Sequence, residues 1–361
     1  MRKMAKKNTE VETKVLEMSN PENLLEVNNL KMHFPITEGL LARVKGYTRA
    51  VDDISFFIRK GETLGLVGES GCGKTTVGRC IARAYEPTAG EILYRNTDNE
   101  VVDLAALDRK EIKPYRKDVR MIFQDPYSSL NPRMTVFEII SEVLKVNQLA
   151  SRSEMENKVE VILQRVGLRP EYVKRYPHAF SGGERQRIGI ARALITNPSL
   201  IVCDEAVSAL DVSIRAQILN LLEALQNDFQ LTYLFVSHDL SVIRHICNRV
   251  VVMYVGKIVE VASGLDIYVD PKHPYTEALM SAVPVSNPRA RKKGARIRLE
   301  GDVANPSNPP SGCYFHPRCR YAKSICAEEA PPLRHMGNEH YVACHFADKL
   351  SLTGVRMADG K

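Results

Sequence analysis

The sequence predicts an α/β fold built on a mostly parallel sheet, and two observations lead to this prediction. Short apolar runs, such as TLGLV at residues 63–67, alternate along the chain with segments whose apolar residues recur every three or four positions. This alternation is typical of strands and helices that follow one another around a parallel sheet. The run at residues 63–67 is followed directly by the glycine-rich segment GESGCGKTT, which has the spacing of a phosphate-binding loop, or P-loop.

The P-loop predicts an ATP site. Glycines let backbone N–H groups close around an anion, and the helix expected at residues 77–85 adds the positive end of its dipole. Lys74 is then placed to reach the β- and γ-phosphates, and the Thr75 hydroxyl to bind Mg²⁺. The alternative, a strand-to-helix turn that binds nothing, is disfavoured because every position of the pattern is filled. The predicted ATP contacts are Gly68, Glu69, Ser70, Gly71, Cys72, Gly73, Lys74, Thr75 and Thr76.

Composition and length predict a soluble globular protein of two or three structural units. The 361 residues are 44% hydrophobic and 26% charged, which is ordinary for such proteins. No apolar run approaches the ~20 residues of a membrane-spanning helix, and no apolar signal core follows the basic first residues. We therefore expect a cytoplasmic protein that reaches a membrane only through a partner or a surface contact. The net charge of +7 suits a nucleotide binder without indicating nucleic acid.

The segment ahead of the P-loop predicts two strands, at residues 24–34 and 50–58, after a polar tail over residues 1–23. Gly46, Tyr47 and Thr48 are expected to form a loop between the strands. The ring of Tyr47 is a candidate for stacking on the adenine base, although a lone tyrosine in a loop is also ordinary.

Several of the later strands are expected to end on polar side chains. Gln124, the Asp204–Glu205 pair and His238 each follow or close an apolar run, so they should meet at the carboxyl edge of a parallel sheet. Asp204 can hold Mg²⁺ through water, and Glu205 can polarise the water that attacks the γ-phosphate. Gln124 and His238 can orient that water, and Gln124 is also a candidate Mg²⁺ ligand with Thr75. The strands are expected at residues 90–94, 120–124, 199–203 and 232–236, with a hairpin at 250–261.

Helical periodicity between Gln124 and the next strand predicts a helical insertion at about residues 126–180. Two helices are expected there, at residues 135–149 and 154–168, and Ser153 with Glu156 predicts a capping box for the second helix. A further helix should run to residue 194. It opens on a glycine pair that makes a second anion site at a helix N-terminus, in the segment Ser181, Gly182, Gly183 and Glu184.

Together these motifs resemble the ATP-binding cassette (ABC) family over residues 24–264. The resemblance identifies residues 68–76 as Walker A, Gln124 as the Q-loop, and residues 181–185 as the signature. Residues 200–205 are then Walker B, residues 208–211 the D-loop with Asp211, and His238 the switch histidine. Val207, the residue before the D-loop serine, departs from the resemblance, because the family usually has Thr or Pro at this position. The resemblance implies a RecA-like core, a β subdomain and an inserted helical subdomain. It also implies a second cassette, because Ser181–Glu184 and Asp211 of one chain complete the ATP site of its partner.

A narrower resemblance links the chain to the ATPase subunits of oligopeptide and dipeptide permeases, most closely their F-type subunit. It rests on residues 123–135, on residues 270–279, and on the tail from residue 312 to Cys344. It implies a C-terminal extension at residues 265–361, and partners comprising a D-type ATPase subunit, two permease chains and a substrate-binding protein. These would place the chain on the cytoplasmic face of the cell membrane, with peptides as cargo.

The cysteines fall into two groups. Cys72, Cys80, Cys203 and Cys247 lie singly on expected core elements, where they serve as small apolar residues. The tail group indicates a metal site, because disulfides are rare in a reducing cytoplasm and the segment has little core of its own. The resemblance implies a [4Fe–4S] cluster in some members, and zinc or free thiols are the alternatives. The tail group is Cys313, Cys319, Cys326 and Cys344.

Other interpretations remain open from the sequence. The same importer class could carry nickel, glutathione or another small solute. A soluble cassette ATPase acting in DNA repair or on ribosomes is disfavoured, because the insertion has the size of a small domain and the chain has a single P-loop. The basic residues at 289–298 are read either as a solvated linker or as a contact for anionic lipid headgroups.

Overall fold

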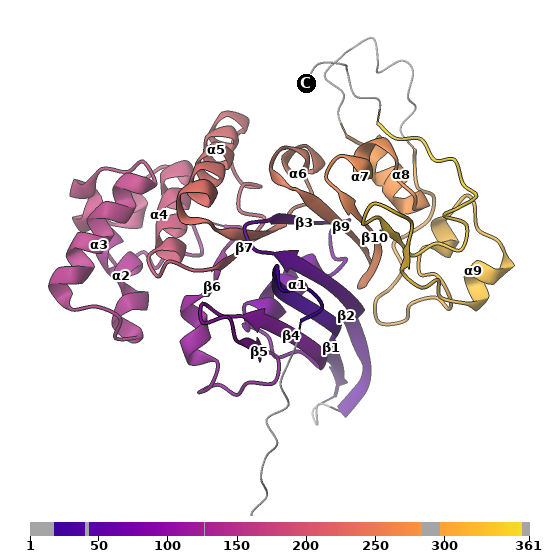
Figure 1. Cartoon of the computed structure of the whole chain (residues 1–361), viewed down its shortest axis with the longest axis horizontal. Coiled ribbons are helices and arrows are strands. Elements are labelled where there is room, and N and C mark those ends of the chain that lie inside the picture. Colours follow the sequence, from indigo (N-terminus) through magenta and orange to yellow (C-terminus); the bar gives the residue numbers. More distant parts are fainter. Residues whose placement is uncertain (1–17, 40–42, 126, 284–296, 356–361) are drawn as a thin grey trace, which may run out of the picture.

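The structure is a computed structural model that describes residues 18–39, 43–125, 127–283 and 297–355. Most of the predicted polar tail and nearly all of the basic segment at 289–298 lie outside the described residues. Figure 1 shows a large central sheet, a smaller sheet carrying the N-terminal strands, a helical unit on one side and the C-terminal region on the other.

The smaller sheet is antiparallel, with the strand order β2-β1-β4-β5. The two predicted N-terminal strands are confirmed, but both are longer than expected. The prediction of a loop at Gly46, Tyr47 and Thr48 is wrong, because these residues lie within β2 and pair with Ile36, Pro35 and Phe34 of β1. Pairing with β1 satisfies the backbone groups of this segment and outweighs the local glycine signal. The strands are β1 (Asn23–Glu38), β2 (Arg43–Arg59), β4 (Ala89–Arg95) and β5 (Val101–Asp103).

The large sheet has the order β11-β12-β10-β9-β3-β8-β7-β6. The strands from β9 to β6 in this order are mutually parallel, whereas β10, β12 and β11 add an antiparallel edge. The predicted parallel sheet is therefore confirmed. The strands are β3 (Thr63–Val67), β6 (Val119–Ile122), β7 (Leu200–Asp204), β8 (Thr232–Val236), β9 (Arg249–Tyr254), β10 (Lys257–Ser263), β11 (Arg334–His335) and β12 (Tyr341–Val342).

Helix α1 packs between the two sheets. Its side chains Val77 and Ile81 are fully buried and belong to one apolar cluster with Leu25 of β1 and Leu66 of β3. The helix begins inside the glycine-rich segment and ends at Ile81, earlier than the sequence predicted. The other helices of the body and the C-terminal region are α4 (Gly182–Leu194), α5 (Val212–Phe229), α6 (Leu240–Ile246), α7 (Asp266–Val269), α8 (Pro274–Ser281) and α9 (Ser324–Glu328), with α1 at Lys74–Ile81.

The helical insertion contains α2 (Val136–Val146) and α3 (Arg152–Arg165), and both begin with a capping box. The predicted box of Ser153 with Glu156 is wrong. Ser151 caps α3 instead, because its side chain accepts the backbone N–H of Glu154. The segment SRSEME offers the Ser-x-x-Glu pattern in two frames, and the earlier frame adds two residues to the helix. Short 3-10 helices lie at Lys113–Lys117, Pro170–Lys174, Pro177–Ala179 and His316–Arg318.

The C-terminal region packs onto the rest of the protein. Strand β12 continues the large sheet by pairing with β10, where Val342 lies opposite Glu260. Phe315 is fully buried and belongs to the same apolar cluster as Tyr254 of β9 and Tyr275 of α8. Among the described residues no helix is both long and apolar enough to cross a membrane.

Candidate nucleotide-binding site

The P-loop joins β3 to α1 and fits closely against two other strands. Gly68, Gly71 and Gly73 have positive φ angles of 152°, 80° and 106°. A Cβ atom on Gly73 would lie 2.0 Å from the carbonyl oxygen of Ala50 in β2, and one on Gly68 would lie 2.2 Å from that of Met253 in β9. Glycine is therefore required at both positions by backbone conformation and by space.

Lys74 lies at the start of α1 and is almost fully buried. Its ammonium group donates to the carbonyl oxygens of Gly68 at 2.8 Å and Glu69 at 2.9 Å. The lysine charge thus lies inside the loop that the sequence predicts to hold phosphate, and the loop curls around it.

The predicted Mg²⁺ residues Thr75 and Asp204 are brought together. The Thr75 hydroxyl donates to Oδ1 of Asp204 at 2.8 Å, joining the start of α1 to the end of β7. Burial raises the pKa of the Asp204 carboxyl, and the hydrogen bond from Thr75 offsets part of this rise. A buried carboxylate beside a hydroxyl is an oxygen donor set that suits a hard cation such as Mg²⁺.

The side chains of Gln124 and His238 converge on Glu205, the residue that follows β7. Oε2 of Glu205 accepts the amide N–H of Gln124 at 2.9 Å, and Oε1 lies 3.1 Å from Nδ1 of His238. Strands β6, β7 and β8 are neighbours in the sheet, so their carboxyl ends bring the three side chains to one place. The amide of Gln124 contacts Glu205, not the Thr75–Asp204 pair. The backbone of Glu205 is left-handed, with φ of 47°.

The signature residues form a separate surface at the start of α4. Ser181 is the N-cap, and its backbone N–H and hydroxyl donate to Glu184 at 2.9 Å and 2.8 Å. These two hydrogen bonds hold the pKa of Glu184 below its usual value. A Cβ atom on Gly183 would lie 2.6 Å from Ile214 of α5, so glycine permits α4 and α5 to pack closely. Asp211 is the exposed N-cap residue of α5.

The signature surface and the P-loop are not joined directly. Within the part of the chain that the structure describes, no hydrogen bond or ion pair links residues 181–184 to residues 68–76.

Tyr47 lies on β2, and 51% of its surface is exposed. It is in the same strand as Ala50, whose carbonyl faces Gly73. Its stacking on adenine stays a prediction.

Sequence reasoning missed two residues of the C-terminal region that contact the P-loop. Arg318 forms an ion pair with the Glu69 carboxylate at 2.8 Å, and the hydroxyl of Tyr275 accepts the Glu69 backbone N–H at 2.8 Å. Arg318 and Glu69 are 249 positions apart, and no local pattern in the sequence relates them.

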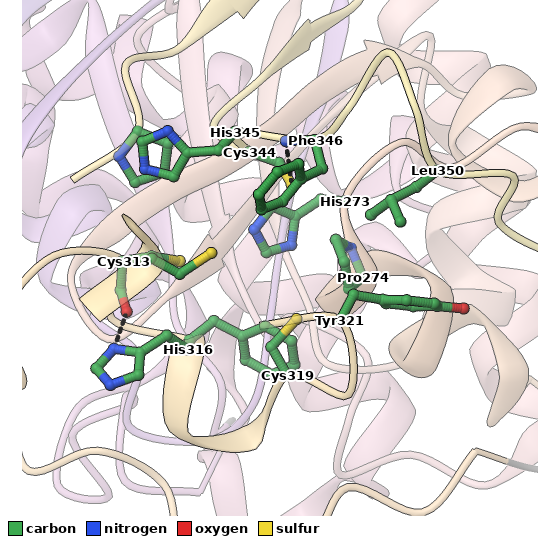
Figure 2. A pocket seen from close by; sticks show the side chains of 13 residues that line it. His273, Pro274, Cys313, His316, Cys319, Tyr321, Cys344, His345, Phe346 and Leu350 are labelled. Carbon is green, nitrogen blue, oxygen red and sulfur yellow. Dashed lines mark hydrogen bonds between the residues drawn. The ribbon is translucent and has the colours of Figure 1, made fainter. Parts of the chain in front are cut away.

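The tail cysteines line one small cavity of about 20 Å³, together with His273, Phe315 and other side chains (Figure 2). Burial raises the pKa of Cys313 to about 12, and the nearby thiols of Cys319, Cys344 and Cys326 contribute to the rise. Burial likewise raises the pKa of Cys319 to about 11. However, in the described ranges no three His, Cys, Asp or Glu side chains are grouped closely enough to hold a metal ion. The predicted iron–sulfur cluster is therefore not supported by this arrangement.

Comparison with known proteins assigns the family. The ABC transporter model matches residues 51–208, and the model of the oligopeptide/dipeptide transporter C-terminal region matches residues 259–326. The oligopeptide transport ATP-binding protein AppF of Bacillus subtilis (strain 168) is 53% identical over 91% of this chain and 98% of that relative. The oligopeptide transport ATP-binding protein OppF of Haemophilus influenzae is 50% identical over 90% of this chain and 98% of its own.

A solved structure gives the same result for the fold. The ATP-binding cassette MJ0796, in a dimeric post-hydrolysis state with ADP and Pi, superposes with a TM-score of 0.57 at 27% identity, covering 66% of this chain and 98% of that one. The chain therefore belongs to the ABC transporter ATPases, within the group that carries the oligopeptide/dipeptide transporter C-terminal region.

Proposed function

We propose that this chain is the ATP-hydrolysing subunit of an importer that carries peptides across the cell membrane, and that it lies on the cytoplasmic face. The observation that supports the ATPase role best is the convergence of Gln124 and His238 on Glu205, next to the Thr75–Asp204 pair. The peptide cargo is supported by relatives named as oligopeptide transport and peptide import ATP-binding proteins.

The residues of the site have distinct roles in this proposal. Lys74 and the backbone N–H groups of the P-loop bind the phosphates, and Thr75 and Asp204 hold Mg²⁺, directly and through water respectively, with Gln124 as a further candidate ligand. The bound cation neutralises charge on the phosphate oxygens. The contacts of Glu205 with Gln124 and His238 hold its carboxylate in place, and we assign this carboxylate the role of polarising the water that attacks the γ-phosphate. His238 and Gln124 position that water.

The signature surface is proposed to act on a second cassette. Ser181, Gly182, Gly183 and Glu184 form a partly exposed helix start, and the N–H groups of a helix start favour an anion. Together with Asp211 they would cap ATP held by a D-type ATPase partner. Two permease chains would contact the helical insertion, and a substrate-binding protein would join the assembled importer. We propose no nucleic-acid partner.

The test of this proposal is co-purification from membranes. The chain should be recovered with a second cassette ATPase and two permease chains, and labelled peptide uptake should require it. Deleting the gene should abolish uptake, and the unaltered gene, but not one encoding Glu205→Gln, should restore it. Recovery of the chain with ribosomes or DNA and without permease chains would contradict the proposal.

For the C-terminal region we propose the transporter extension at residues 265–361, with a metal bound by its cysteines. Four thiols lining one cavity are a soft donor set that suits zinc or iron–sulfur chemistry. The volume of about 20 Å³ has room for about one water-sized occupant. Because the described side chains are not grouped closely enough in threes to hold a metal ion, binding of either zinc or a [4Fe–4S] cluster would require the four thiols to move closer together.

We expect protein purified without oxygen to contain zinc or iron, measured by elemental analysis. Cys319→Ser should lower the metal content and the melting temperature, because metal binding stabilises a segment with little core of its own. Cys80→Ser is the matched control, since Cys80 is buried in α1, and it should leave metal content unchanged. Protein with neither metal would leave free thiols as the remaining interpretation.

A further inference from the structure

The side chain of Glu69 in the P-loop is bound by an arginine of the C-terminal region. Nη1 of Arg318 donates to Oε2 of Glu69 at 2.8 Å, and Nη2 donates to Oε1 at 3.3 Å. The Arg318 side chain is only 8% exposed, whereas that of Glu69 is 30% exposed. A bidentate guanidinium–carboxylate pair fixes the orientation of both groups, which a single point charge does not do.

The backbone of Glu69 is bound by the same region. Its N–H donates to the hydroxyl of Tyr275, which is fully buried in α8. The Tyr275 ring packs against Tyr254 and Phe315 with centroid distances of 4.8 Å and 5.4 Å. The contact therefore comes from a buried aromatic cluster, and Phe315 of this cluster lies close to Arg318 in the sequence.

Glu69 in turn contacts the lysine of the site. Its carbonyl oxygen accepts the Lys74 ammonium group at 2.9 Å. A shift of Glu69 would therefore move a partner of Lys74 and change the shape of the loop that surrounds the phosphates. Arg318, Glu69 and Lys74 form a continuous connection from the C-terminal region to the centre of the nucleotide site.

The energetics of the Arg318–Glu69 ion pair indicate that it fixes the shape of the P-loop more than it adds to the overall stability of the protein. An ion pair whose carboxylate is about a third exposed contributes little to the stability of the fold. Burial would lower the pKa of Arg318, but its two hydrogen bonds to Glu69 and the nearby Glu69 charge outweigh this effect and raise the pKa. The guanidinium is thus permanently charged and held in one orientation.

We propose that Arg318 is a positioning residue of the nucleotide site, through which the C-terminal region holds the P-loop in the shape that binds ATP. The inference rests on the nucleotide site of the proposed function and is independent of the cargo. In this proposal the C-terminal region contributes to nucleotide binding, in addition to extending the edge of the large sheet.

The test compares Arg318→Ala with Arg320→Ala in the full-length chain, using equilibrium binding of ATP and the melting temperature. Arg320 lies two residues away and pairs with the buried Glu277 at 2.9 Å, without contacting the P-loop. We expect Arg318→Ala to weaken ATP binding by about ten- to a hundredfold. This is the scale known for residues that orient metal ligands by hydrogen bonding to them. Arg320→Ala should leave ATP affinity unchanged even where it lowers the melting temperature.

Conservative variants separate positioning from general damage. Arg318→Lys keeps the charge but not the bidentate geometry, so it should restore ATP affinity only in part. Glu69→Gln should match Arg318→Ala, and the double variant should be no worse than either single one, because both remove the same interaction. Unchanged affinity in Arg318→Ala, or an equal loss in Arg320→Ala, would overturn the inference. Failure of the unaltered chain to bind ATP would instead refute the nucleotide site itself.

Discussion

Replacing Glu205 with Gln is expected to slow ATP hydrolysis by on the order of 10²–10⁴, the usual scale for a general base, while ATP binding stays intact. The substitution removes the carboxylate that both Gln124 and His238 contact in this structure, but keeps the shape of the side chain. Lys74 and Thr75, the residues proposed to bind phosphate and Mg²⁺, contact other groups, so the affinity for ATP should not fall.

Single-turnover hydrolysis and equilibrium ATP binding, measured on the assembled importer, check this expectation. Glu223→Gln is the matched control, since Glu223 is exposed on α5, and it should leave both quantities unchanged. Turnover of Glu205→Gln within a few-fold of the unaltered protein would show that another group acts as the base.

Replacing Gly73 with Ala should nearly abolish ATP binding. The new Cβ atom would lie 2.0 Å from the carbonyl oxygen of Ala50, a backbone atom that moves only if β2 or the start of α1 moves with it. The residue must also hold a φ of 106°, which disfavours any side chain. Because a misplacement of about 1 Å can cost about 10²-fold in a site of this kind, we expect at least that loss of affinity for ATP.

Gly71→Ala separates the two causes of this loss. Gly71 has a similar φ of 80°, but a Cβ atom there would meet no other atom within 4 Å. Its cost should be limited to the left-handed backbone, about 1–2 kcal/mol, so ATP affinity should fall less than in Gly73→Ala. Titration of both variants with a fluorescent ATP analogue measures the difference, and equal losses would contradict the steric argument.

The sequence alone was sufficient to place most of the candidate nucleotide-site residues on their elements. The P-loop is a contiguous pattern, so Lys74 and Thr75 could be assigned from local spacing. Gln124, Glu205 and His238 are far apart in the chain, but each follows an apolar run. Because parallel strands bring their carboxyl ends to one edge of a sheet, the prediction that they meet was correct.

Local patterns failed where two solutions were equally good locally. Tyr47 was expected in a loop, yet β1 extends far enough to pair with it. Ser153 and Ser151 both offer a capping box, and the structure uses Ser151. In each case the outcome depended on a partner or a helix start that short-range spacing does not specify.

The sequence by itself determined which motifs are present and at which edge of the sheet they act. What only the tertiary structure decided was how the C-terminal region meets the site: Phe315 enters the common core, and Arg318 binds Glu69 across 249 positions of sequence. Such a contact arises from the packing of separate elements in three dimensions, and side chains brought together this way leave no periodicity or spacing in the chain that could predict them.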